Sequence, residues 1–333
     1  MSGVILSNFS AMPKSKITSN LVTNKLRGVR ISLFFMGSDE FASVILERLK
    51  SDSLFEILGV VVPPDAPVGR RAVLTPCPVK QFGLNVGLSI FEDPESLKGR
   101  EMDFLVVASY GRILKRPILE LPRYVALNVH PSLLPLYRGA SPIQSALLNG
   151  EVVSGVTIMQ MISRMDAGPI YAFSEVAIRT DHNAENLRTE MARCGAELLA
   201  QTIPGIFEGS IESKNQNENQ ATYCTKMDRL SGEIDWNHDS AIEVERKWKA
   251  YFAWPGIYTT FKGKRLKLLS GHSGGGDENG QAGKVMRLSE GSIGIQTRKG
   301  ILILKEVQME GKSPISVQEF VRGQPDFIGS ILT

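Results

Sequence analysis

Runs of consecutive apolar residues recur along the first two-thirds of the chain and alternate with stretches of more widely spaced apolar positions. A continuous apolar run is typical of a strand buried on both faces, and the wider spacing is typical of a helix. The helical pattern is clear in residues 37–50, where a Ser or an Asp can cap the first turn. Four runs predict buried strands, at 31–36, 55–62, 103–111 and 124–130. This alternation predicts a parallel sheet covered on both faces.

Two further strands, at 154–162 and 169–177, and a helix at 184–207 complete this first domain, which we expect to span residues 31–207. The first strand is followed only by Gly37 and not by the GxGxxG fingerprint of dinucleotide-binding domains. We therefore predict an α/β fold with a Rossmann-like, mostly parallel sheet that lacks this fingerprint.

The pattern changes after residue 207. Residues 208–221 are polar and predict a linker. A short helical piece around 240–251 is then followed by short alternating segments with Gly-containing turns between them. This pattern predicts a small antiparallel β-barrel as a second domain at residues 222–333.

Composition adds limits on the class of protein. The chain of 333 residues is long enough for two domains, and its 42% hydrophobic and 22% charged residues are typical of soluble globular proteins. No run approaches the roughly 18 apolar residues that a membrane span requires. The three cysteines, Cys77, Cys194 and Cys224, are odd in number and have no CxxC spacing. They argue against a disulfide framework and a thiolate zinc site, and they fit a reducing compartment.

The first thirty residues form a separate segment. They contain five Lys or Arg and no acidic residue, they are rich in Ser, and they have no long apolar core. We expect an organellar transit peptide here, mitochondrial with chloroplast as the alternative, and a disordered tail is the other interpretation. The remaining chain carries 33 basic and 35 acidic residues, so any nucleic-acid binding must depend on local patches.

Candidate chemistry lies where the strand at 124–130 ends. Asn128 and His130 are two positions apart, so their side chains point to the same face of the strand. Open parallel sheets bind ligands beyond the carboxyl ends of their strands, which is where this pair falls. Pro131 and Pro135 stiffen the chain that follows. We expect this loop to hold functional groups in place.

An amide beside an imidazole suits acyl transfer. The Asn128 N–H can stabilise an oxyanion, an effect of roughly 3–4 kcal/mol, and His130 can move a proton near neutral pH. Asp166 follows another apolar strand and is the candidate carboxylate that orients the histidine. No GxSxG nucleophile motif is present, so the nucleophile would belong to the substrate. On spacing alone, His130 as a packed residue and Asp166 as an ordinary turn residue remain open.

The stretch NVHPSLLPLYRGASPIQSALLNGEVVSGVTIMQMISRMDAGPIYA strongly resembles the methionyl-tRNA formyltransferases, a branch of the folate-dependent formyltransferases that share N-x-H-x-S-L-L-P and a later D-x-G. The resemblance runs from about Ile31 to beyond Leu304. It also includes FFMGSDEFA, PDAPVGRRAVLTPCPVK, VVASYGRIL, TYCTKM and IDW.

The resemblance implies transfer of a formyl group from 10-formyltetrahydrofolate, as cosubstrate and without a prosthetic group or metal, to the α-amine of initiator methionyl-tRNA. The product would serve initiation of organellar translation. The chain would act as a monomer, and its second domain would be an OB-like barrel that touches the tRNA. The implied catalytic residues are Asn128, His130 and Asp166, and the implied folate-binding residues are Ser132, Leu133, Leu134 and Pro135.

The resemblance also places tRNA-binding residues. Arg70 and its neighbour Arg71 lie in a loop after the second strand that would reach the acceptor stem, with a solvated basic loop as the alternative. Lys262, Lys264, Arg265 and Lys267 form a candidate phosphate patch or, equally, a solvated hairpin face.

Three related interpretations compete with this one. A sugar N-formyltransferase and a formyltetrahydrofolate hydrolase would share the same core and a barrel, whereas the loop GRRAVLTPCPVK and the strand GVTIMQM favour the tRNA enzyme. A folate- or RNA-binding relative without activity would not need all three candidate catalytic side chains. The segment ISRM before Asp166 departs from the acidic-Gly pattern common in bacterial members, which leaves the folate contacts of that loop open.

Overall fold

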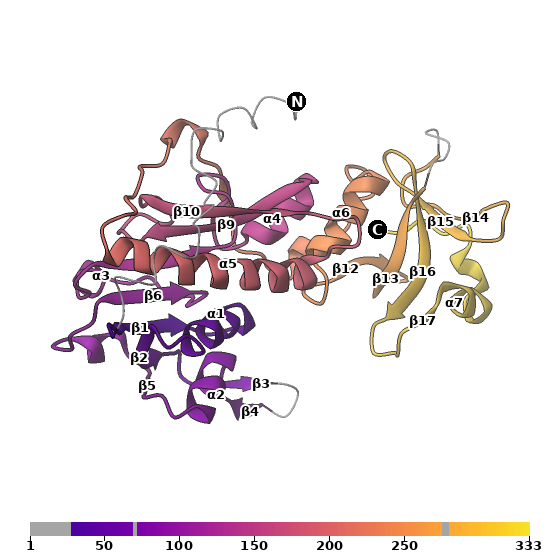
Figure 1. Cartoon of the computed structure of the whole chain (residues 1–333). Helices are drawn as coiled ribbons and strands as arrows, with labels where there is room; N and C mark the ends of the chain where they lie inside the picture. Colours follow the sequence, from indigo (N-terminus) through magenta and orange to yellow (C-terminus); the bar gives the residue numbers. More distant parts are fainter. Residues whose placement is uncertain (1–27, 69–71, 275–279) are drawn as a thin grey trace. The chain divides into compact units, whose positions relative to one another are not determined.

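The computed structural model describes residues 28–68, 72–274 and 280–333. The chain divides into two compact units (Figure 1). The first contains the residues up to Gly139 together with Val153–Ala177 and Arg188–Tyr223, and the second contains Ala140–Val152, Ile178–Leu187 and Cys224–Thr333. Within the described residues, no helix is long and apolar enough to cross a membrane.

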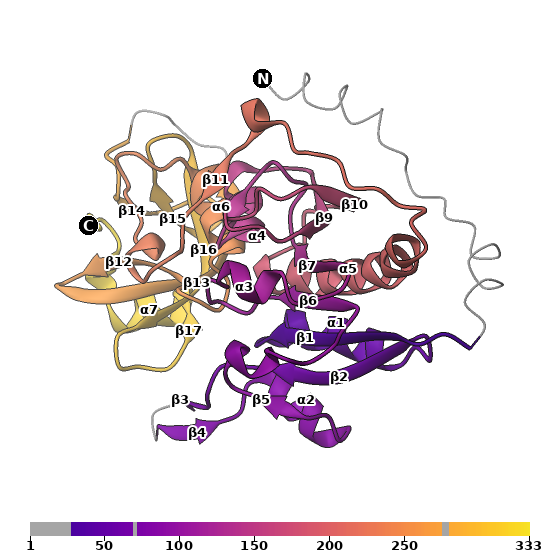
Figure 2. The same cartoon turned by 90° about the vertical axis from the view of Figure 1, so that its left-hand side faces the viewer.

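A seven-stranded sheet in the order β10-β9-β7-β6-β1-β2-β5 forms the centre of the first unit, and Figure 2 shows several of these strands side by side. Strands β7, β6, β1, β2 and β5 are parallel, whereas β9 is antiparallel to both β7 and β10. The strands are β1 (Ile31–Gly37), β2 (Phe55–Val61), β5 (Ile90–Phe91), β6 (Phe104–Ala108), β7 (Val125–His130), β9 (Val153–Gln160) and β10 (Ile170–Ala177). The prediction of a mostly parallel sheet is confirmed.

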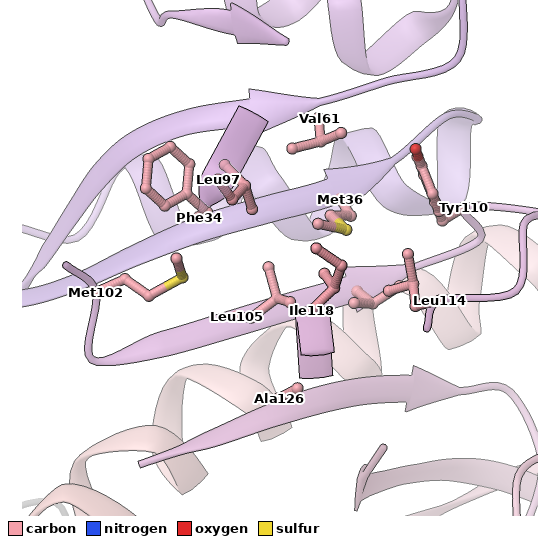
Figure 3. Packing of buried hydrophobic residues seen from close by; sticks show 11 residues of the cluster. Phe34, Met36, Val61, Leu97, Met102, Leu105, Tyr110, Leu114, Ile118 and Ala126 are labelled. Atoms are coloured by element: carbon pink, nitrogen blue, oxygen red, sulfur yellow. The ribbon is translucent and has the colours of Figure 1, made fainter. Parts of the chain in front are cut away.

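Helices cover both faces of this sheet. Helix α1 (Glu40–Lys50) packs on β1, β2 and β6, and the Asp39 side chain caps it by accepting a hydrogen bond from Ala42 N. On the other face, the 3₁₀ helix Pro94–Leu97 and helix α3 (Arg116–Leu119) cover an apolar cluster. Figure 3 shows side chains of this cluster, among them Phe34, Met36, Leu97, Leu105 and Ile118. The unit also contains α2 (Pro78–Asn85) and most of α5 (Ala184–Phe207).

Two short pairs of strands lie outside the large sheets. Strand β3 (Ala66–Val68) pairs with β4 (Val73–Thr75), and β8 (Arg138–Gly139) pairs with β11 (Tyr223–Cys224). The polar stretch 208–221, for which we predicted a linker, belongs to the first unit. It is bound at Lys214, whose backbone N–H and carbonyl exchange two 2.8 Å hydrogen bonds with Ile170.

The second unit contains a curled antiparallel sheet in the order β12-β13-β16-β15-β14, with β17 paired to β16. It also contains helices α4 (Pro142–Asn149), α6 (Ala241–Ala250) and α7 (Val317–Gly323). A capping box between Ser240 and Glu243 begins α6. The strands are β12 (Ile257–Phe261), β13 (Lys264–Gly274), β14 (Val285–Arg287), β15 (Ile293–Gln296), β16 (Ile301–Met309) and β17 (Ile315–Ser316).

Residues 329–333 connect the two edge strands of this sheet. Val285 of β14 exchanges hydrogen bonds with Gly329 and Ser330, and Thr260 of β12 exchanges hydrogen bonds with Thr333. The predicted small barrel is therefore a curled half-barrel whose open side is spanned by this segment.

Candidate active site

The candidate pair Asn128 and His130 lies at the end of β7, at the edge of the sheet where the parallel strands β1, β6 and β7 all end. His130 is buried, with 4% of its surface exposed, whereas Asn128 is half-buried. Among the residues that the structure describes, the Asn128 carboxamide has no hydrogen-bond partner. Its N–H groups are therefore available to a bound ligand at the edge where open sheets bind ligands.

The imidazole of His130 has a defined tautomer. Its Nε2 lies 3.0 Å from the backbone oxygen of Tyr137. A carbonyl oxygen only accepts hydrogen bonds, so Nε2 carries the hydrogen, and in the neutral ring Nδ1 keeps its lone pair. Tyr137 is itself held in a left-handed conformation, with φ +59°, and its N–H donates to Thr222 Oγ1 at 2.8 Å. The loop thereby fixes which ring nitrogen can accept a proton.

Asp166 faces this accepting nitrogen. Its Oδ2 lies 3.8 Å from His130 Nδ1, and the same oxygen accepts a 2.8 Å hydrogen bond from Gly139 N. The distance is longer than a hydrogen bond, so the carboxylate and the ring are neighbours rather than bonded partners. A proton that arrives at Nδ1 would be stabilised by the nearby negative charge. The three predicted catalytic residues therefore belong to one unit, with Asp166 beside His130.

The turn that carries Asp166 is tightly constrained. Asp166 has φ +49°, a left-handed conformation that is uncommon for residues other than glycine. Two residues later, a Cβ on Gly168 would lie 1.8 Å from the carbonyl oxygen of Gln160 at the end of β9. Only glycine fits there in this backbone conformation, so the D-x-G pattern has a steric cause.

The predicted folate-binding segment, residues 132–135, follows His130 closely in the chain and is held by hydrogen bonds and packing. Ser132 is fully buried, and its hydroxyl donates to Leu136 O at 2.6 Å. Thr157 Oγ1 donates to Ser132 O at 2.6 Å and accepts from Leu134 N at 3.2 Å, which ties the segment to β9. Leu134 packs in a small cluster with Met159 and Ile170. The side chains of Ser132 and Leu134 are thus used within the protein.

Arg138 is a functional candidate that the sequence reasoning missed. Its side chain is fully buried, and each of its five N–H groups donates one hydrogen bond. The acceptors are Gln216 Oε1, both carboxylate oxygens of Glu218 and the hydroxyl of Tyr223. No periodicity pairs an arginine at 138 with a polar stretch about 80 residues away, so the pattern of residues contains only a weak signal for this contact.

The hydrogen bonds of this network shift the pKa values of its charged groups. Hydrogen bonds from Arg138 and Arg164 lower the pKa of the Glu218 carboxyl to about 2. Burial opposes the charge on Arg138, but its hydrogen bonds to Glu218 and Tyr223 leave the pKa of the guanidinium above its ordinary value. Arg164 belongs to the same turn as Asp166, and its Nη2 lies 2.7 Å from Glu218. Glu218 therefore joins the loop after β7 to the turn after β9.

The structure describes four of the six predicted tRNA-binding residues. Arg70 and Arg71 lie outside the described residues. Lys262 donates to Gln324 at 3.0 Å and forms an ion pair with Asp326, so part of its charge is neutralised. The Arg265 guanidinium lies 4.1 Å from the centre of the Tyr258 ring. The other two residues of the predicted patch are Lys264, which is exposed, and Lys267, which is half-buried.

The cysteines and the other metal-ligating side chains were also candidates for chemistry. Cys77, Cys194 and Cys224 form no disulfide within the part of the chain that the structure describes. Within residues 28–68, 72–274 and 280–333, no group of three or more His, Cys, Asp or Glu side chains is placed to hold a metal ion.

Two family models match the chain. The model described as formyl transferase covers residues 29–203, and the model described as formyl transferase, C-terminal domain, covers residues 226–325. These two matches include the Asn128, His130 and Asp166 site and the curled half-barrel.

Several curated relatives are similar over almost their whole length. The chain is 38% identical to a methionyl-tRNA formyltransferase of Caldicellulosiruptor saccharolyticus, with 91% of this chain and 100% of that protein covered. It is also 38% identical to the enzyme of the same name from Roseiflexus castenholzii, with 88% and 96% covered.

Solved structures of lower identity share the fold. An N-formyltransferase from Helicobacter canadensis, in complex with folinic acid and dTDP-3-aminofucose, superposes with a TM-score of 0.63 at 19% identity, with 84% of this chain and 99% of that one covered. HypX from Aquifex aeolicus, in complex with tetrahydrofolic acid, gives a TM-score of 0.58 at 18% identity, with 87% and 46% covered. The two family matches and the identity to full-length relatives agree, and this chain belongs to the formyl transferase family.

Proposed function

We propose that the protein transfers the formyl group of 10-formyltetrahydrofolate to the α-amine of methionyl-tRNA. The observation that carries this proposal is the arrangement of three side chains. The His130 Nδ1 lies 3.8 Å from Asp166 with its lone pair free to accept a proton, and the nearby Asn128 amide has no hydrogen-bond partner among the described residues. It occurs in a chain that aligns over 91% of its length with a methionyl-tRNA formyltransferase.

The reaction requires one C–N bond to form and another to break. The neutral amine attacks the formyl carbon, and the carbonyl oxygen of the formyl group becomes an oxyanion. Asn128 donates an N–H to this oxyanion. The former amine then loses a proton, the bond from the formyl carbon to N10 of the folate breaks, and N10 receives a proton. No electrons are exchanged with a second cofactor.

His130 is the proton carrier in this scheme. Because its Nε2–H is bound to Tyr137 O, the proton from the amine arrives at Nδ1, and the same nitrogen returns it to N10. The hydrogen bond from Nε2 to Tyr137 O orients the ring, and Asp166 stabilises the transient imidazolium. An α-amine has a reference pKa of about 7.7–8.0, so near pH 7 the substrate must first lose its ammonium proton.

The folate and tRNA contacts follow from the same assignment. The segment from Ser132 to Pro135 would shape the folate site by its backbone and by Leu133, because the side chains of Ser132 and Leu134 are already used within the protein. Arg70 and Arg71 would meet the acceptor stem. Phosphate contacts would come from the exposed side chains of the predicted patch, above all Lys264 and Arg265.

We further propose that the first thirty residues direct the protein to mitochondria, where its product would start translation, with chloroplasts as the alternative. The support is their acid-free, Ser-rich composition ahead of the first strand. We also propose that the protein acts as a monomer.

The direct test is the incubation of purified protein with formyl-labelled 10-formyltetrahydrofolate and three acceptors: methionyl-tRNA, an amino-sugar nucleotide and water. We expect the label to appear in formylmethionyl-tRNA. Label in the sugar nucleotide or released as formate would identify one of the rival activities, and no turnover would indicate an inactive relative.

A further inference from the structure

Gln216 is the central residue between two parts of the site. Its Nε2 donates to the backbone oxygens of Asp166 and Gly168, at 2.8 and 2.7 Å. Its Oε1 accepts from Arg138 Nε at 3.1 Å and from Arg138 Nη2 at 2.8 Å. Both N–H groups and both lone pairs of the amide are therefore used. A flipped amide would place its N–H groups against N–H groups of Arg138 and its oxygen against the two backbone oxygens. The geometry admits one orientation of this side chain.

The two carbonyls that Gln216 binds belong to the turn that carries the catalytic carboxylate. Asp166 adopts a left-handed backbone conformation there, which persists only where surrounding contacts impose it. The neighbouring residues of the turn, from Ser163 to Met165, are exposed and contribute little packing. The amide of Gln216 therefore supplies contacts that the turn needs from outside its own sequence.

The segment around Gln216 is itself anchored at both ends. Lys214 pairs with Ile170 through two backbone hydrogen bonds, and Glu218 binds both Arg138 and Arg164. We name residues 214–218 the strap. It connects the loop after β7 with the turn after β9, and all of its partners lie in the first unit.

We propose that Gln216 is a positioning residue for the transfer reaction. It holds the backbone of Asp166 so that the carboxylate stays bound to Gly139 N and directed at His130 Nδ1. This inference rests on the proposed function for its kinetic consequence, but the positioning itself is a structural property that can be measured without activity.

The substitution Gln216→Glu tests this role with almost no change in volume. The new carboxylate still accepts from Arg138, but it presents an oxygen to the two carbonyl oxygens that Nε2 now binds. We expect kcat to fall on the order of tenfold to a hundredfold, the scale of a displacement of about 1 Å or less, whereas both KM values should stay within about twofold. Gln220→Glu is the matched control, because it makes the same change at an exposed position nearby and should leave kcat unchanged.

A double-substitution cycle separates positioning from a general effect of the strap. In an Asp166→Asn background, Gln216→Glu should reduce kcat by no more than about twofold further, because the group it positions has already lost its charge. An equal loss in both backgrounds would overturn the proposal. Should the Glu variant not fold, Gln216→Met removes the same donors without adding charge and should show the same kinetic pattern.

Hydrogen exchange at the Gly139 amide tests the geometry alone, because this N–H is bound to Asp166 Oδ2. We expect faster exchange in Gln216→Glu than in the native protein or in Gln220→Glu. Unchanged exchange would refute the positioning role, and so would normal kcat despite faster exchange. If the native protein does not formylate methionyl-tRNA, the proposed function fails while the exchange result still decides whether Gln216 holds Asp166.

Discussion

Replacing Gly168 by alanine is the sharpest single perturbation of the site that the structure offers. The added Cβ would lie 1.8 Å from the Gln160 carbonyl oxygen and 2.9 Å from its carbon, where ordinary contact begins at 3.4 Å. Gln160 cannot move easily. It is the last residue of β9, it pairs with Leu127 of β7, and its N–H donates a hydrogen bond to Pro169 O. The turn must therefore move away by about 1.6 Å, and it carries Asp166 with it.

The expected magnitudes follow from this displacement. A shift of about 1 Å in a reacting group can reduce a rate on the order of a hundredfold, so single-turnover formyl transfer should slow by roughly that factor or more. Overpacking of this kind also destabilises a protein by about 1–3 kcal/mol, and the contact with a backbone atom places Gly168→Ala toward the upper end. Rapid-quench measurement of formylmethionyl-tRNA and urea unfolding provide the two readouts.

The control is a glycine with free space around it. A Cβ on Gly323, at the end of α7, would meet nothing within 4 Å, and Gly323 is not among the residues with positive φ. Gly323→Ala should leave the transfer rate unchanged and raise the free energy of unfolding by about 0.4–1 kcal/mol. If Gly168→Ala transferred formyl groups within about threefold of the native rate, the D-x-G turn would not be the element that fixes Asp166.

Four further predictions test other parts of the account. Asn128→Ala, His130→Ala and Asp166→Ala should each slow single-turnover transfer by roughly two or more powers of ten while folate and tRNA binding, measured separately, persist. Arg70→Ala should weaken use of methionyl-tRNA and reduce the slope of log K against log salt by about one, with folate binding unchanged. The pKa of Glu218 is lowered from its ordinary value of 4.5 to about 2, so its ionised carboxylate stabilises the protein fully above pH 4.5 and this stabilisation is lost as the pH falls through 2. The free energies of urea unfolding of the native protein and of Glu218→Gln should therefore become equal as the pH approaches 2. Removal of the first thirty residues should preserve transfer by the purified protein and abolish import into organelles, which a fluorescent fusion would reveal.

The apolar pattern predicted the positions of the principal strands because a strand buried on both faces needs consecutive apolar residues. The run at 31–36 is β1, which ends one residue later, and the run at 124–130 contains β7. An apolar run carries no direction, however, so the antiparallel placement of β9 was not predicted. The hairpin β3–β4 was missed for a different reason, because Val73 and Leu74 are largely exposed and its strands are only three residues long.

The site was predictable to the extent that it depends on local spacing. A period of two placed Asn128 and His130 on one face. The position of Asp166 just after another apolar strand made it the candidate carboxylate, and the family resemblance implied the same residue. The contacts of the strap could not be predicted from local spacing, since its polar composition is equally typical of a linker. Polar residues in a linker bind water, whereas Gln216 and Glu218 bind Arg138, and composition does not distinguish these two partners.

The 3.8 Å between His130 Nδ1 and Asp166 Oδ2 has a physical explanation in the tautomer. With its hydrogen on Nε2, the neutral ring turns a lone pair toward the carboxylate, so there is no attraction to shorten the distance until a proton reaches Nδ1. The carboxylate is meanwhile held from its other side by Gly139 N, and its backbone is held by Gln216. If the reaction proceeds as we propose, the negative charge is in place before the proton transfer and the reaction need not reorganise it. In the proposed reaction, the contribution of Asp166 would therefore depend on hydrogen bonds to residues other than the histidine, and these come from the loop after β7 and from the strap.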